Sequence, residues 1–475
     1  MRRVALAALL VLVSAVLAGC AGSTASSSED EGAAELVPSS VDLYAVVDGD
    51  LGSEGWLEAR TLIAAFPRLE AFVDELLAEH GRELDAALGP EVALAVVNLE
   101  YHEAVALTEP DDPEALERLV AEVDGAVAEL EGGWWAAAPD ERAIRRLLAA
   151  READGALAER EDFRRLTGDL PEDALARLFV RGGPADDALA DLPTLPGELG
   201  QALECLLAGR ELPSAAFALR PEEDGIRLDG ALERPDDWPV DDDGFFDVAD
   251  RAPEGPIVFA GAAGLPEGVE RALACAAGGA EGGEGLELLR TLGFGLDALL
   301  PGEVALLVYP ASGRSGSPTV SLWAQIEDEE RTRAALDELG AMASALVPGI
   351  TVEEVDVHPD QTRPALVVER DGEPVLFLAV DPGMLVASTA EQGVEGLLLP
   401  GDASVGSDAR FRAAVERLDV GYPIGEAAVY VDVDAAGDML MPRPKAKALE
   451  PLKTLLVGAK AEGDVVVVRG FLAFD

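Results

Sequence analysis

The feature that most constrains the fold of this 475-residue chain is a set of segments that recur, in the same order, in its two halves. The tract LDAALGPEVALAVV, beginning at Leu84, matches LDALLPGEVALLVY, beginning at Leu296. Four further segments correspond in order, ending with GIRLDGAL from Gly225 and GDVVVVRGFL from Gly463. Self-similarity of this kind indicates repeated structural units. The sequence therefore predicts two diverged tandem repeats.

The recurring segments also set the expected domain boundaries. The first repeat is expected over residues 36–234 and the second over residues 252–475. Between them, residues 235–251 contain PDDWPVDDDG, an acidic and proline-marked stretch typical of a linker. Each repeat, at about 200 residues, is long enough to bury a core of its own.

Within each repeat, short apolar strands alternate with amphipathic helices. Apolar residues at helical spacing between Leu62 and Leu77 predict one buried helix face. Asp112, which precedes PEALERL, suits a helix N-terminus because its side chain can accept free backbone amide hydrogens. Strands joined by short turns favour antiparallel sheets packed with helices, an α+β fold. The second half carries an additional stretch, residues 351–380, whose three β-rich runs predict a meander.

The N-terminus has the pattern of an export signal. Arg2 and Arg3 precede an apolar run that ends in Leu-Ala-Gly-Cys20. The run is shorter than the roughly 20 apolar residues that a spanning helix needs, and a charged start with small residues before a cut site indicates a cleaved signal. The last four residues resemble the bacterial lipobox. We expect residues 1–19 to be removed and Cys20 to carry the lipid anchor.

Residues 20–35 contain no large apolar side chain and predict a flexible tether behind that anchor. Together, signal, anchor and tether predict a lipoprotein held at the outer face of the plasma membrane. An ordinary signal peptide with a chance cysteine, or an uncleaved anchor, is the alternative at this stage.

The formal net charge of −55 narrows the expected partners. Phosphate binding needs clustered cations, so this composition argues against nucleic acid and against anionic lipid headgroups. The membrane is expected to be reached through the lipid on Cys20 instead. The same excess of carboxylates would suit a salt-rich habitat, which remains an open hypothesis.

Two further cysteines, Cys205 and Cys275, stand in apolar, helix-like contexts. A disulfide is permitted outside the membrane, and a buried free cysteine is equally natural in such surroundings. Spacing alone does not decide between the two.

Candidate metal and catalytic residues are sparse. The three histidines, His80, His102 and His358, lack the ligand spacing of a zinc site. Three aspartate-rich loops offer oxygen ligands for calcium without completing a calcium-binding loop; they begin at Asp48, Asp241 and Asp432. No Gly-x-Ser-x-Gly elbow or phosphate-binding loop occurs. We therefore predict no catalytic residue, no metal site and no cofactor.

The adjacent Trp134 and Trp135 could suggest stacking of a sugar or peptide. Consecutive strand residues point to opposite faces, so at most one of the two is expected to be exposed. Packing in the core is the favoured interpretation.

The order of these segments resembles that of a known family. A strand after Leu36-Val-Pro-Ser-Ser40, a helix opening at Phe66-Pro67, and the strand LGPEVAL beginning at Leu88 are similar to domain-of-unknown-function family 3352. That family occurs mostly in actinobacterial exported or membrane-anchored proteins. The resemblance implies export and no assigned activity, and it supplies no catalytic residues.

These observations favour a membrane-anchored extracytoplasmic lipoprotein that binds an envelope ligand or partner without catalysis. The alternatives are a hydrolase of envelope substrates that uses carboxylates, and a structural component of the envelope. Whether the chain is an enzyme stays open from sequence, with the non-catalytic reading preferred.

Overall fold

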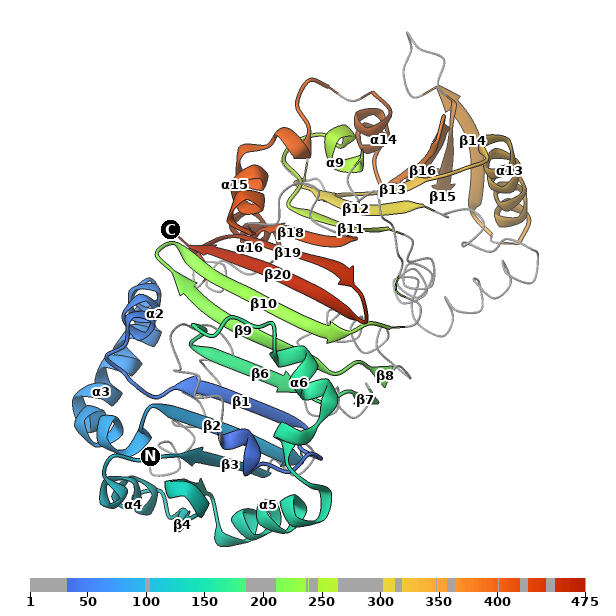
Figure 1. The fold of residues 1–475 in the computed structure, drawn as a ribbon. Helices are drawn as coiled ribbons and strands as arrows, with labels where there is room; N and C mark the ends of the chain where they lie inside the picture. The colour runs from blue at the N-terminus through green and yellow to red at the C-terminus, as the bar shows by residue number, and fades with distance from the viewer. Residues whose placement is uncertain are drawn as a thin grey trace. The chain divides into compact units, whose positions relative to one another are not determined.

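The structure is a computed structural model, and its described residues form two compact units (Figure 1). Unit 1 comprises the described residues up to 235 together with 462–474, and unit 2 comprises those from 238 to 461. The described residues are 32–98, 103–184, 211–235, 238, 247–263, 302–311, 318–346, 348–356, 364–399, 401–418, 426–440 and 449–474.

Unit 1 begins with a short 3-10 turn and contains most of the strands of the first half of the chain. Its helical elements are η1 (Ala33–Glu35), α2 (Glu54–Ala64), α3 (Pro67–Leu88), α4 (Pro113–Ala121), η2 (Glu131–Gly133), α5 (Glu141–Asp154), η3 (Leu157–Glu159) and α6 (Glu161–Thr167). Its strands are β1 (Leu43–Asp48), β2 (Glu91–Asn98), β3 (Glu103–Thr108), β4 (Ala126–Glu129), β5 (Trp135–Ala138), β6 (Ala176–Val180), β7 (Gly183–Pro184), β8 (Glu211–Leu212), β9 (Ala215–Glu222), β10 (Gly225–Glu233) and β20 (Val465–Phe474).

Unit 2 has the same kinds of element. Its helical elements are α9 (Asp247–Arg251), α13 (Glu329–Leu346), α14 (Glu391–Leu398), η4 (Val405–Ser407), α15 (Ala409–Leu418) and α16 (Val433–Leu440). Its strands are β11 (Val258–Ala263), β12 (Glu303–Tyr309), β13 (Thr319–Gln325), β14 (Ile350–Asp356), β15 (Pro364–Arg370), β16 (Glu373–Asp381), β17 (Met384–Ser388), β18 (Ala427–Asp432) and β19 (Leu452–Glu462).

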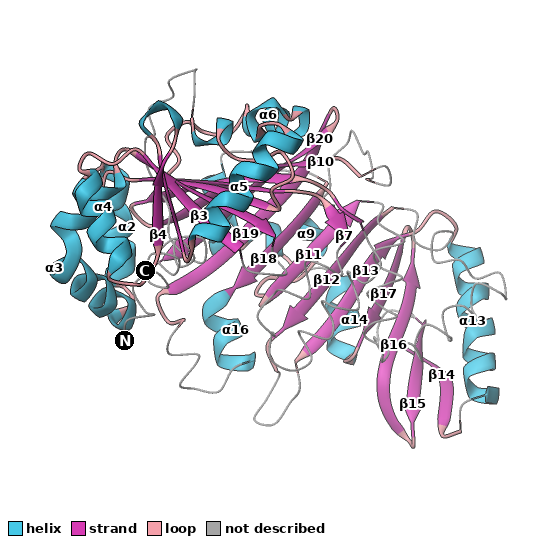
Figure 2. Ribbon diagram, turned by 90° about the horizontal axis from the view of Figure 1, so that it is seen from below, coloured by secondary structure: helices cyan, strands magenta, loops and turns pink. Residues whose placement is uncertain are grey.

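Every strand pairing within the two units is antiparallel among the described residues. In unit 1 the strand order is β4-β5-β3-β2-β1-β6-β9-β10-β20. In unit 2 it is β14-β15-β16-β17-β13-β12-β11-β18-β19. Helices pack on these sheets (Figure 2). The predicted α+β fold is thus confirmed, as are the three strands expected over residues 351–380.

The two strand orders correspond when β1 is set against β11. Strands β5-β3-β2-β1-β6-β9 of unit 1 then fall on β17-β13-β12-β11-β18-β19 of unit 2. An isolated bridge before the first strand also has a counterpart, pairing Pro38 with Ala156 in unit 1 and Pro253 with Ser404 in unit 2. The units therefore share the order of these strands. Unit 2 adds β15 and β14 beyond β16, and unit 1 adds β10 and β20 beyond β9.

Helices occupy both faces of each sheet. In unit 1, α5 and α6 contribute Ile144, Leu147 and Leu166 to the cluster that contains Tyr44 and Phe179. Helices α2, α3 and α4 lie on the opposite face. In unit 2, α14 and α15 take the first face, and α13 packs Ala335 against the second. Packing of helices on both faces of a sheet is consistent with strands that are near-continuous apolar runs.

The C-terminus departs from the expected boundaries. Residues 252–475 were expected to form one repeat, but β20 pairs along its whole length with β10 and belongs to unit 1. Its residues Val466 and Val468 are buried there. Long-range pairing of a terminal strand leaves no local signature in the sequence, because the strand pattern is the same whichever sheet receives it.

Two segments expected to be unstructured are partly folded. The end of the predicted tether forms η1, where Ala33 is fully buried, because Ala33 and Val37 pack in the core of unit 1. The end of the predicted linker forms α9, whose Val248 and Ala249 are fully buried. Small apolar residues inside polar stretches supplied enough contact area to order both ends.

Among the described residues, no helix is both long and apolar enough to span a bilayer. The predicted signal, residues 1–19, lies outside them.

Candidate functional site

The predicted site residues lie outside the part of the chain that the structure describes. This holds for Cys20, the expected lipidation site, and for Cys205 and Cys275, the two other cysteines. Lipidation and the choice between disulfide and free thiols therefore stay predictions.

The aspartates proposed as calcium ligands shape turns instead. Asp48 Oδ1 accepts a hydrogen bond from the Asp50 amide at 2.9 Å, and Asp50 Oδ1 accepts one from the Gly52 amide at 2.9 Å. Asp432 caps α16 through the Ala435 amide at 3.0 Å. Its second carboxylate oxygen is paired with Arg410. In the loop that begins at Asp241, residues 241–246 lie outside the described part of the chain. Among the described residues, no group of three or more side chains that could hold a metal ion occurs.

The histidines bring no site together within the described residues. His80 lies on α3, 3.9 Å from a Glu79 carboxylate oxygen and 4.0 Å from a Glu83 carboxylate oxygen. These side chains are too few and too far apart to hold a zinc ion. His102 and His358 lie outside the described residues.

Trp134 and Trp135 pack on opposite faces, as strand alternation predicted. Trp134 is buried in the cluster around Tyr44, and Trp135 lies half-buried against the cluster that contains Ala137. The core interpretation is thus confirmed for Trp134, and Trp135 is partly covered.

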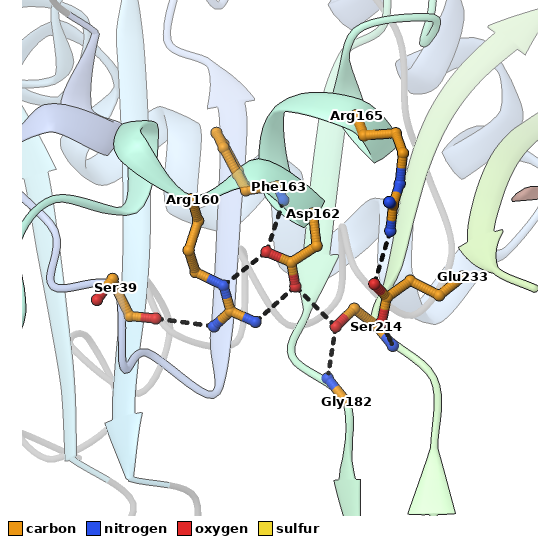
Figure 3. A network of polar contacts seen from close by, with 8 residues as sticks. All are labelled: Ser39, Arg160, Asp162, Phe163, Arg165, Gly182, Ser214 and Glu233. Carbon is orange, nitrogen blue, oxygen red and sulfur yellow. Dashed lines mark hydrogen bonds and ion pairs between the residues drawn. The ribbon is translucent and has the colours of Figure 1, made fainter. Parts of the chain in front are cut away.

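A polar cluster in unit 1 joins five segments that are separated in sequence (Figure 3). The Arg160 guanidinium donates two hydrogen bonds to the Asp162 carboxylate, of 2.7 and 2.5 Å. It donates a third to the Ser39 carbonyl at 2.8 Å. Its guanidinium carbon also lies 5.5 Å from the centre of the Phe179 ring. The Asp162 carboxylate accepts a further bond from the Ser214 hydroxyl at 2.9 Å.

A second ion pair closes the cluster around Ser214. Arg165 donates to Glu233 at 2.7 Å, and the other Glu233 oxygen accepts from the Ser214 amide at 3.3 Å. The Ser214 hydroxyl accepts from the Gly182 amide at 3.1 Å. Two carboxylates thus converge on one buried serine, each held by its own arginine (Figure 3).

The electrostatics of this cluster favour a structural role. Burial of the Asp162 carboxylate acts to raise its pKa, but hydrogen bonds from Arg160 and Ser214 outweigh it and bring the pKa below its usual value. A carboxylate held ionised in this way is a poor proton donor and a weak base at neutral pH. The Ser214 hydroxyl is committed to one acceptor and one donor. The cluster ties the segment around α6 to β9 and β10.

One sheet face of unit 2 carries two apolar rows that cross five strands. Ten residues on five adjacent strands form two rows in register, and we call them the apolar sheet face. One row is Leu322, Leu306, Ala260, Val429 and Val457, and the other is Val320, Val308, Val258, Val431 and Leu455. Every member is apolar, in a chain of which 27% of residues are charged.

The apolar sheet face is not fully covered. Val429, Leu306 and Val320 expose 42%, 40% and 36% of their surface, and none of the ten residues is buried. Helix α13 covers the neighbouring row, where Val304 and Ala324 pack against Ala335. Val320 lies diagonally to Leu306 on the next strand, and Ala260 separates Leu306 from Val429. A contiguous exposed apolar area can mark a place where a protein meets a ligand or partner.

The corresponding face of unit 1 differs in exposure. Its two rows are also wholly apolar and run through Leu94, Ala45 and Leu178 and through Val96, Leu43 and Val180. None of these residues is exposed. The exposed apolar rows therefore belong to unit 2 and not to unit 1.

This exposed surface could not be predicted from the sequence. Apolar runs such as EVALLVY predict strands, but both faces of such a run are apolar, so exposure of one face depends on what packs over it. The in-register rows result from the pairing of strands that are distant in sequence.

Comparison with known proteins adds little to this geometry. No family model matches the chain, and no curated protein does. Among solved structures, crystal form III of TP0453 matches with a TM-score of 0.28 and 9% identity, covering 48% of this chain and 95% of that chain. Crystal form I of TP0453 matches with a TM-score of 0.27 and 10% identity, covering 48% and 94%. Scores this low carry no argument about function.

Proposed function

We propose that this protein is an extracytoplasmic lipoprotein that binds an envelope ligand without catalysing a reaction on it. Anchoring through Cys20 at the outer face of the plasma membrane is supported by the signal pattern and the lipobox resemblance. The observation that carries the binding role is the apolar sheet face of unit 2, with Leu306, Val320 and Val429 exposed.

The chemistry of that face defines the ligand. Ten apolar side chains offer no charge and no side-chain hydrogen bond, so only removal of apolar surface from water can drive association. Each Å² of apolar surface that a ligand covers contributes about 25 cal/mol, from which the cost of association is subtracted. The ligand is therefore expected to present hydrocarbon, as an acyl chain or an apolar protein segment does.

The polar cluster of unit 1 supports the non-catalytic reading. A carboxylate hydrolase needs one carboxyl group that is protonated and able to donate. Asp162 is held ionised by Arg160, and Glu233 is paired with Arg165. The cluster therefore does not offer the protonated carboxyl group that such a hydrolase needs.

We also infer that the two units arose by duplication of one ancestral unit. The shared strand order and the equivalent bridges at Pro38 and Pro253 support this inference. On this inference the two units then diverged in what they expose, and the exposure of Leu306, Val320 and Val429 supports ligand binding in unit 2. Resemblance to family 3352 is consistent with an exported protein of this kind.

The binding role is tested with Nile red, a neutral dye whose emission rises and shifts to the blue in apolar surroundings. We expect the full chain to bind the dye, and Leu306→Glu to weaken that binding by about tenfold, which corresponds to about 1.4 kcal/mol. Leu57→Glu is the matched control, because Leu57 is 56% exposed on α2 and is not a member of the apolar sheet face. Equal binding by wild type and Leu306→Glu, with both folded, would overturn the proposal.

Anchoring has a separate test. Cells fed a tagged fatty acid should label the wild-type chain and leave Cys20→Ser unlabelled. Labelling of Cys20→Ser to the same extent would refute the assignment of the lipid to that residue.

A further inference from the structure

The sheet of unit 2 ends at strand β14, which has no equivalent strand in unit 1. Among the described residues, β14 pairs with β15 alone, over seven residues from Ile350↔Arg370 to Asp356↔Pro364. In unit 1 the sheet stops two strands earlier, at β4. The outer edge of an antiparallel strand carries backbone amides and carbonyls that a further strand can pair with.

Side chains of β14 select the charge of any added strand. Glu353, Glu354 and Asp356 are all exposed, and none of them has a cationic partner in the ion pairs of the described chain. Like charges directly opposite each other destabilise a strand pair. A second copy of β14 would bring these carboxylates together, so self-association through this edge is disfavoured, whereas lysine or arginine would be matched.

The strand is held in place from one side. Helix α13 packs against β14 (Figure 2). At Gly340 of this helix an added Cβ would lie 3.0 Å from the Val352 Cγ1, so the helix and strand are in close contact. Ordering of the edge before binding lowers the entropic cost of adding a strand.

We propose that β14 is a docking edge for an extended, lysine- or arginine-rich segment of a partner protein, which adds to the sheet as a further strand. Backbone hydrogen bonds supply the affinity in this mode, and side chains on alternate positions supply the selectivity. Strand β14 lies at one end of the strand order of unit 2, and β19 lies at the other. Docking at β14 does not depend on the proposed binding at the apolar sheet face.

The test uses the full chain and a fluorescent eight-residue peptide that alternates lysine with threonine or valine. We expect saturable binding by fluorescence anisotropy and slower amide hydrogen exchange in β14 when the peptide is present. The same peptide with alternate backbone nitrogens methylated keeps its charge but loses the donors on one edge. It should bind about tenfold more weakly.

Charge selectivity is tested with the triple variant Glu353→Gln, Glu354→Gln and Asp356→Asn, which should also weaken binding. The control neutralises three exposed carboxylates of α3, as Glu75→Gln, Glu79→Gln and Asp85→Asn, and should bind like wild type. Equal binding of the methylated peptide, equal losses in both triple variants, or unchanged exchange in β14 would each overturn the proposal.

Discussion

Phe163 of unit 1 and Phe411 of unit 2 make the same pair of edge-on ring contacts. Phe163 lies 5.9 Å from Tyr44 and 5.2 Å from Phe179, measured between ring centres. Phe411 lies 5.9 Å from Phe259 and 5.3 Å from Tyr430.

The strand partners of these rings are equivalent as well. Tyr44 faces Phe179 across β1 and β6, and Phe259 faces Tyr430 across β11 and β18. In each unit these three aromatic rings pack one helix, α6 or α15, against two central strands.

Truncating either central ring should destabilise its own unit. Phe411→Ala removes a fully buried side chain and is expected to cost about 3–5 kcal/mol of unfolding free energy. Phe163→Ala should cost less, because Phe163 is only partly buried. Urea unfolding followed by hydrogen exchange would show which unit loosens. Phe411→Leu, which keeps most of the volume, is the control, and an equal loss from Phe411→Ala and Phe411→Leu would contradict the packing argument.

The ring contacts also indicate how residues of the two helices correspond. They match Phe163 to Phe411, so that Asp162 corresponds to Arg410. In a chain this rich in carboxylates, an aspartate match is weak evidence, whereas a buried ring is constrained by its neighbours.

The parts predicted from sequence are those with a local periodic signal. Strand tracts such as the one beginning at Leu84, the meander after Thr351 and the burial of Trp134 follow from alternation and repetition. The pairing of β20 with β10 and the exposure of Val429 depend on long-range packing, which no local pattern encodes.

A second equivalence concerns how closely a helix approaches the sheet. Gly393 of α14 corresponds to Ala143 of α5, and Ser388 of β17 corresponds to Ala138 of β5. A Cβ on Gly393 would lie 2.1 Å from Ser388 Oγ and 2.6 Å from Ser321 Oγ. The two hydroxyls, 2.9 Å apart, fill the space that a methyl group would need.

Gly393→Ala should therefore destabilise unit 2 by about 1–3 kcal/mol, through overpacking. Adding Ser388→Ala, which reproduces the residue pair of unit 1, should recover part of that loss. Thermal unfolding of the two single variants and the double variant measures the coupling. Strict additivity of the two changes would contradict the assigned contact.

The Asp162 carboxylate makes a pH-dependent contribution to stability. Its folded pKa lies below the unfolded value, because the hydrogen bonds of Arg160 and Ser214 outweigh the effect of burial. The stabilisation is thus fully present above the unfolded pKa of about 3.9 and is lost as the pH falls through the folded pKa.

Asp162→Asn should cost about 2 kcal/mol at pH 7, because it weakens charge-assisted hydrogen bonds to a partly buried arginine. The difference from wild type should shrink as the pH falls below about 4. Asp169→Asn, at an exposed position after α6, should behave like wild type throughout. A pH-independent difference for Asp162→Asn would show that the ionised carboxylate is not the source of the effect.

The C-terminal strand should stabilise the N-terminal unit. Phe471 on β20 is 2% exposed, and its ring lies directly over Gly225 of β10. Phe471→Ala is expected to cost about 3–5 kcal/mol and to speed amide exchange in β9 and β10. Unchanged exchange over residues 215–233 would contradict the assignment of β20 to unit 1.

Native mass spectrometry of the full-length protein, isolated from a host that processes lipoproteins, tests the central claim most directly. The proposed binding predicts a reproducible added mass, beyond the lipid on Cys20, that organic solvent removes and that is absent when Leu306 and Val429 are both changed to glutamate. A wild-type protein without added mass, or the same added mass on the folded double variant, would contradict ligand binding at the apolar sheet face.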